Sequence, residues 1–235
     1  MIFACFLKSV GQIGDPRFRK VLFLGVGLTL ALLIVVYAGI LWLLQMAVGD
    51  STTLPLIGEV TWVGDLLTGA SLILMLVLSV FLMVPVASAI TSMFLDEVAQ
   101  AVEDVHYPDL PPAVSVPFGE ALRDTINFLG VIVGANTLAL ILYAIFAPFA
   151  PLIFFALNGY LLGMEYFQLA AMRRVGRVNA KAMRRKHRGT IWLAGTLMAV
   201  PLSVPVVNLL IPILGAATFT HMYHAIQARP RAPSG

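Results

Sequence analysis

The residues with the clearest chemical potential lie directly before the first long apolar segment. There Asp15 and Pro16 precede three cations, Arg17, Arg19 and Lys20. Proline suits the first turn of a helix, and the unpaired amides of that turn carry a partial positive charge. An anion bound there would be stabilised by the helix dipole, by paired hydrogen bonds from the planar guanidinium groups of arginine and by the charge of the lysine ammonium group. The alternative is that these cations only anchor the cytoplasmic end of a membrane helix, which is their commoner role.

A second polar candidate lies inside the apolar part of the chain. Asn208 stands between Pro205 and Pro212, where a broken helix would aim amide groups at an anion crossing the membrane. Buried amides in helix bundles more often hydrogen-bond between helices, so packing is the default interpretation.

The remaining chemical motifs are weak. His221 and His224 share one helical face, but a metal site needs further ligands and none is apparent nearby. We therefore expect no metal site. The chain has no phosphate-binding loop, dinucleotide fingerprint or nucleophile elbow, so we expect neither an enzyme nor a cofactor.

The composition indicates what kind of molecule must position these residues. Of the 235 residues, 60% are hydrophobic and 11% are charged, against about 25% charged in soluble domains. A water-soluble fold is excluded on this basis. No polar linker divides the chain, so we expect one all-α integral membrane domain over 1–228 and a disordered tail over 229–235.

Two uncharged segments are long enough to cross a bilayer as single helices. They cover 21–49 and 66–95, and a span needs about 20 apolar residues. We predict two long transmembrane helices here, with a kink or an end at Pro85 in the second.

Two further uncharged segments, about 125–164 and 189–226, are interrupted by prolines. Proline removes a backbone donor and breaks the helix, and the pieces of the second segment are too short to span. We predict two helical hairpins that enter the membrane only in part, with a pair of kinked full spans as the alternative for each. The prolines that break these segments are Pro148, Pro151, Pro201, Pro205 and Pro212.

The basic residues predict the orientation. The polar stretch between the two hairpins carries eight cations, whereas the loop 50–65 has acids and no Lys or Arg. Because basic loops stay on the cytoplasmic side, we expect both termini in the cytoplasm. The eight cations are Arg173, Arg174, Arg177, Lys181, Arg184, Arg185, Lys186 and Arg188.

Two polar helices are expected beside the membrane. The acidic segment 96–124 begins with a helical pattern, and we expect its acidic face to pair with the basic stretch 173–188. Anionic lipid head groups are the alternative partner of that stretch, and nucleic acid is not expected. At the N-terminus, apolar residues at helical spacing in 2–10 predict an amphipathic helix that lies on the membrane surface or packs on the bundle.

Three stretches carry a resemblance to a known family. They are the C-terminal run from Pro205 through Asn208 and Pro212 to Gly215-Ala-Ala-Thr218, the stretch Phe94-Leu-Asp-Glu97, and Pro16-Arg-Phe-Arg19-Lys20. Together they resemble the CysZ sulfate permease family within the etoposide-induced-protein superfamily. Lys20 stands where the family has a second arginine, Arg17 where a glycine is common, and Gln100 and Val102 where charged residues are frequent.

The resemblance implies a sulfate channel or transporter with two long spans, two hemi-penetrating hairpins, cytoplasmic termini and a homo-oligomeric assembly. It further implies sulfate binding at Arg19 and Lys20, with the backbone amides around Arg17 and Phe18 nearby. Glu97 matches a family acid and, with Asn208, is the candidate for lining or gating a pore.

The preferred hypothesis is therefore uptake of sulfate or a related oxyanion across the bacterial inner membrane, serving sulfate assimilation and cysteine synthesis. The alternative is a non-transporting membrane scaffold or assembly factor whose acidic and basic helices bind a cytoplasmic partner.

Overall fold

The computed structural model describes residues 1–48, 52–54, 58–60, 69, 86–87, 90–91, 93–113 and 118–228. Within these ranges the regular secondary structure is helical apart from one two-stranded sheet. The second span predicted over 66–95 lies almost entirely outside the described residues, and the predicted tail 229–235 lies wholly outside them.

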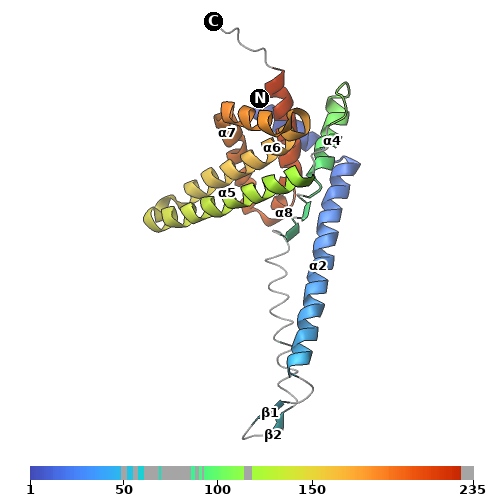
Figure 1. Cartoon of the computed structure of the whole chain (residues 1–235), viewed down its shortest axis with the longest axis vertical. Coiled ribbons are helices and arrows are strands. Elements are labelled where there is room, and N and C mark those ends of the chain that lie inside the picture. Colours follow the sequence, from blue (N-terminus) through green and yellow to red (C-terminus); the bar gives the residue numbers. More distant parts are fainter. Residues whose placement is uncertain are drawn as a thin grey trace.

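The first long span is the helix α2 (Pro16–Val48), which extends away from the other described helices as a single rod (Figure 1). The prediction began this span at residue 21. The helix begins earlier because Pro16 fits its first position and Asp15 caps it, with Oδ1 accepting the Arg17 amide at 2.8 Å. Most side chains along the rod remain exposed and apolar, as expected of a helix that contacts lipid.

A small sheet lies beyond the far end of α2 (Figure 1). Strands β1 (Thr52–Leu54) and β2 (Gly58–Val60) pair antiparallel, with Thr52 opposite Val60. Among the described residues this sheet is the one departure from the predicted all-α fold. Threonine and valine are β-branched and favour strands, but such short runs give little signal in a sequence.

The first predicted hairpin corresponds to α5 (Phe118–Ile145), the 3₁₀ turn η1 (Ala147–Phe149) and α6 (Ala150–Lys186). The chain reverses at the predicted prolines, and the pair of helices projects sideways from the bundle, away from the line of α2 (Figure 1). Helix α6 continues well past the predicted end at 164, because its later residues include good helix formers such as Ala, Met and Arg. The continuous helical path has one non-helical residue, Gly176, with φ of 72°.

The second predicted hairpin is broken into short pieces, as its prolines indicate. These pieces are α7 (Arg188–Ala199), η2 (Val200–Ser203), α8 (Pro205–Asn208) and α9 (Ile211–Gln227). How deeply either hairpin enters a bilayer stays a prediction.

Helix α9 lies at the centre of the bundle and is buried over most of its length. Helix α1 (Ile2–Gly11) packs on it, and Thr218 Oγ1 donates to Ser9 Oγ at 3.2 Å. The opposite face of α1 exposes Phe3 and Leu7. The N-terminal helix is therefore packed on the bundle and also presents the apolar face expected of a membrane-surface helix.

Helix α4 (Leu95–His106) completes the core. Its predicted apolar positions Val98 and Val102 are fully buried, whereas Val105 is exposed. Because α4 packs against both α2 and α9, it connects the start of the long rod with the centre of the bundle.

Candidate functional site: the start of α2 and the acids of α4

The predicted anion-binding cations lie at the start of α2, opposite the acidic side chains of α4. Arg17 Nη1 donates to Asp104 Oδ2 at 2.6 Å, and Lys20 Nζ lies 3.3 Å from Glu97 Oε2. Arg19 is exposed and forms no ion pair with the described residues. The structure thus brings three of the predicted site residues together and adds one acid, Asp104, that was not predicted.

The backbone amides contribute less to this site than expected. The Arg17 amide donates to the Asp15 carboxylate and the Arg19 amide donates to the Asp15 carbonyl. The Phe18 side chain is fully buried and anchors the helix in the core. Side-chain cations are therefore the main donors available to an anion here.

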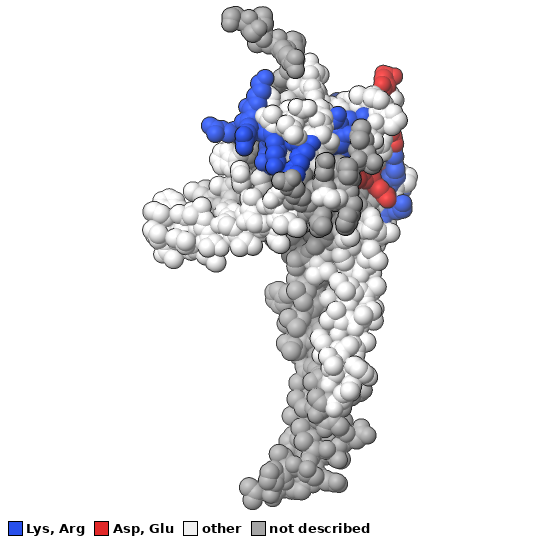
Figure 2. Space-filling model, viewed as in Figure 1, with Lys and Arg blue, Asp and Glu red and all other residues white. Residues whose placement is uncertain are grey.

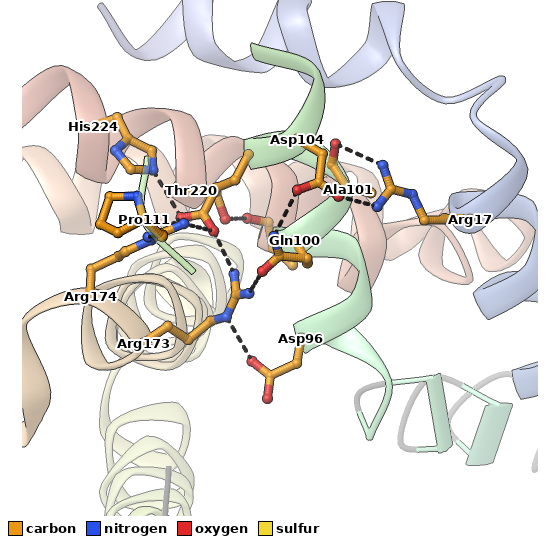
Figure 3. A network of polar contacts seen from close by, with 12 residues as sticks. Arg17, Asp96, Gln100, Ala101, Asp104, Pro111, Arg173, Arg174, Thr220 and His224 are labelled. Atoms are coloured by element: carbon orange, nitrogen blue, oxygen red, sulfur yellow. Dashed lines mark hydrogen bonds and ion pairs between the residues drawn. The ribbon is translucent and has the colours of Figure 1, made fainter. Parts of the chain in front are cut away.

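A second cluster of charges lies on the other side of α4. Figure 3 shows Arg173 and Arg174 of α6 and His224 of α9 converging on this helix. Their shared acceptor is Glu103, whose side chain is 2% exposed. Arg174 binds it with two nitrogens, Nε at 2.8 Å and Nη2 at 2.6 Å, while Arg173 Nη1 donates at 3.1 Å and His224 Nε2 at 3.0 Å.

The electrostatics of Glu103 follow from these contacts. Burial on its own would raise the pKa of the carboxyl, because a low-dielectric environment disfavours charge. Hydrogen bonds from His224 and Arg174, with the charges of Arg173 and Arg174, outweigh burial and lower the pKa to about 2. The carboxylate is therefore ionised at any physiological pH and holds three elements together.

Gln100 joins the two clusters. Its Nε2 donates to Asp104 Oδ1 at 2.8 Å, and its Oε1 accepts from Arg173 Nη2 at 2.6 Å (Figure 3). Arg173 also lies 3.4 Å from Asp96. A chain of polar contacts thus runs from the surface cation Arg17 to the buried Glu103. We call the acids and Gln100 of α4 with their partners Arg17, Lys20, Arg173, Arg174 and His224 the α4 network.

The α4 network confirms the predicted pairing of the acidic helix with the basic stretch through Arg173 and Arg174. Glu103 was not singled out in the sequence. A signal was present, because residue 103 follows the buried Ala99 by four positions and so falls on the apolar face of the helix. An acid on that face requires cationic partners, and the adjacent pair Arg173-Arg174 supplies them.

A cavity of about 310 Å³ adjoins the α4 network. Arg174 forms part of its wall and donates to the carbonyl of Pro111, which also lines the cavity. The lining residues are Leu110, Pro111, Pro112, Arg173, Arg174, Tyr223, His224 and Gln227.

The two predicted histidines have structural partners. His221 is buried and its Nδ1 shares a hydrogen bond of 3.0 Å with the Tyr107 hydroxyl, while His224 binds Glu103. In the described part of the chain no group of three or more candidate ligands is arranged to hold a metal ion.

The two pore candidates lie in different surroundings. Glu97 belongs to the α4 network through Lys20. Asn208 ends the short helix α8, and its side chain forms no hydrogen bond with the described residues. In the described part of the chain no hydrogen bond or ion pair links the two residues, and their role in a pore stays a prediction.

The fold defines a class of protein. Among the described helices, three are long and apolar enough to cross a membrane, within Pro16–Ile40, Ile126–Ile145 and Ala147–Lys186. The chain is thus a helical membrane protein with a charged network at one end.

The chain belongs to the family described as sulfate transporter CysZ/etoposide-induced protein 2.4, whose model matches residues 5–212. No curated protein sequence matches the chain. The match begins within α1 at residue 5, includes the α4 network residues of α2, α4 and α6, and extends into the broken segment as far as Pro212.

Proposed function

We propose that the chain carries sulfate or a related oxyanion across the bacterial inner membrane, as a channel or permease that supplies sulfate assimilation and cysteine synthesis. Its family and its long apolar helices support a transport role. No cofactor is needed for this function, because the protein has only to bind the ion and shield it during passage.

The observation that carries the proposal is the pairing of α2 cations with carboxylates. Arg17 and Lys20 each hold a carboxylate of α4, and both ion pairs are partly exposed. A carboxylate presents two oxygens to a cation, and sulfate can present two of its four oxygens in the same way. The donors that bind the carboxylates therefore also suit an incoming oxyanion. Arg19 adds a third cation beside them.

The distribution of charge supports the proposed orientation. Lys and Arg gather at the end of the molecule where α2 begins, whereas α2 leads away from it (Figure 2). Basic residues mark the cytoplasmic side, so we place this end and both termini in the cytoplasm.

We further propose a homo-oligomer. On the exposed, largely apolar helix α5, Asn136 and Thr137 donate to carbonyls of their own helix, and they have no other hydrogen bond within the described part of the chain. Polar side chains on a lipid-facing helix favour contact with a second helix.

The test is uptake of radiolabelled sulfate into liposomes that contain the purified full-length protein. We expect saturable uptake that is abolished or strongly reduced in an Arg19→Gln, Lys20→Gln double variant. Lys8→Gln, which removes an exposed cation of α1, serves as the matched control and should retain uptake. Uptake equal to that of empty liposomes would reject the proposal.

The scaffold alternative has less support. It requires free acidic and basic helices for a partner, whereas Glu103, Arg173 and Arg174 bind one another within the chain. A protein that co-purifies in stoichiometric amount, together with absence of sulfate flux, would favour it.

A further inference from the structure

The basic stretch of α6 is divided at Gly176 into two parts with different surroundings. Before the glycine, Arg173 and Arg174 are buried against Glu103. After it, the chain carries cations that form no ion pair with the described residues. These are Lys181, Arg185 and Lys186 at the end of α6 and Arg188 at the start of α7, which we call the corner cations.

The corner cations lie beside an apolar surface. Trp192, Leu193 and Leu197 of α7 remain 43%, 49% and 54% exposed. The Trp192 indole Nε1 donates to the Ala156 carbonyl of α6 at 2.9 Å, which fixes the ring against the neighbouring helix. Tryptophan is enriched at the boundary between lipid and water. The boundary is therefore expected to cross α7 near Trp192, with cations on one side and apolar side chains on the other.

We propose that the corner cations bind the phosphate head groups of anionic lipids. Cations near an anionic leaflet attract its head groups, and the apolar face of α7 would contact the acyl chains of the same lipids. A soluble acidic partner would engage only the charges and leave the adjoining apolar surface uncovered, so lipid fits both features. This inference concerns a surface separate from the start of α2 and does not depend on sulfate transport.

The chain contains three tryptophans, which allows a local measurement. A Trp42→Phe, Trp62→Phe variant of the full chain keeps Trp192 as its only indole. The protein is reconstituted in phosphatidylcholine vesicles that contain either brominated phosphatidylglycerol or brominated phosphatidylcholine at equal mole fraction. We expect stronger quenching of Trp192 by the brominated anionic lipid, and a smaller preference at high salt.

The charge requirement is tested in the same background. Each cation strengthens adsorption to an anionic surface about fivefold, so Arg185→Gln with Arg188→Gln is expected to weaken the relative affinity roughly 25-fold. Lysine at both positions keeps the charge and should keep the preference.

A variant that retains only Trp42, exposed near the far end of α2, serves as the positional control and should be quenched equally by the two lipids. Equal quenching of Trp192 by both lipids would overturn the proposal and leave a soluble acidic partner as the ligand of the corner cations. A preference that survives the glutamine substitutions would overturn it as well. If the glutamine variant fails to fold, the comparison of the two lipids at Trp192 alone still decides.

Discussion

At the scale of single residues, the buried carboxylate Glu103 determines how the helices meet. It lies on the apolar face of α4, where an ionised acid without partners would be very unfavourable. Two guanidinium groups and an imidazole satisfy it, from positions 70, 71 and 121 residues away in the sequence. Because all these groups are buried together, removing the shared carboxylate leaves the cations around it with too little negative charge.

We therefore predict that Glu103→Gln lowers stability by about 3 kcal/mol, since it removes the carboxylate shared by two buried arginines and, among the described residues, leaves Arg173 only the ion pair with the exposed Asp96. The wild-type protein gains this stabilisation fully above the ordinary glutamate pKa of 4.5 and loses it as the pH falls from there toward about 2. Thermal unfolding in detergent between about pH 6 and about pH 2, a range that covers this window, should show a steep acid dependence in the wild type and a flatter one in the variant. An equally steep dependence in the variant would assign the acid sensitivity to other groups.

The surface acids of α4, Asp104 and Glu97, are expected to weaken sulfate binding. They form ion pairs with cations that are proposed to bind sulfate. The hydrogen bond from Arg17, followed by that from Gln100, lowers the pKa of Asp104, so this acid is ionised and competes with an incoming anion. Exposed ion pairs contribute roughly 0.2–1 kcal/mol. We predict that Asp104→Asn with Glu97→Gln tightens sulfate binding roughly two- to fivefold per substitution.

Equilibrium binding of radiolabelled sulfate to the purified variants measures this effect. Asp109→Asn, an acid outside the α4 network, is the control and should leave affinity unchanged. Unaltered affinity in the double variant, with measurable binding in the wild type, would show that the acids do not compete with sulfate.

At the scale of elements, the proline breaks could be predicted from the sequence and the glycine break could not. Proline lacks an amide hydrogen wherever it stands, so Pro148 and Pro205 indicate helix ends without knowledge of the fold. Gly176 departs from the helix through a φ of 72°, which glycine permits but does not require. The sequence predicted that the acidic segment pairs with the basic stretch. It did not identify Glu103 as the centre of that pairing, because this role depends on contacts between residues far apart in the sequence.

Another element-scale feature is the close crossing of α6 and α7 at Gly159, Gly163 and Gly195. A Cβ atom added at Gly195 would meet the carbonyl oxygen of Gly159, which is backbone and cannot rotate away. We predict that Gly195→Ala lowers stability by about 1–3 kcal/mol, as overpacking does elsewhere. Gly130→Ala in α5, where no atom lies within 4 Å, is the matched control and should be neutral or slightly stabilising. Thermal unfolding of both variants in one detergent compares them, and equal melting temperatures would show that the crossing tolerates a side chain.

At the scale of the whole molecule, charge and apolar surface are separated along the direction of α2. Lys and Arg side chains gather where α2 begins, while β1 and β2 lie beyond its other end (Figures 1 and 2). The sequence predicted this separation because basic residues cluster in a few stretches between long uncharged segments. The sideways projection of α5 and α6 could not be predicted, since it depends on how α6 packs against α7 and α9.

The separation of charge leads to a prediction of topology. Cys5 is the only cysteine, so a Cys5→Ser background accepts one new thiol at a time. A membrane-impermeant maleimide added to intact spheroplasts should label a Thr53→Cys variant, in β1, and should not label a Lys186→Cys variant, at the end of α6. This orientation is expected because the opposite one would move the eight cations of the basic stretch across the membrane. In inverted membrane vesicles, where the cytoplasmic face is outside, the labelling pattern should be reversed. Labelling of Lys186→Cys from outside intact cells would reverse the proposed orientation and place the start of α2, with the cations proposed to bind sulfate, on the outer surface.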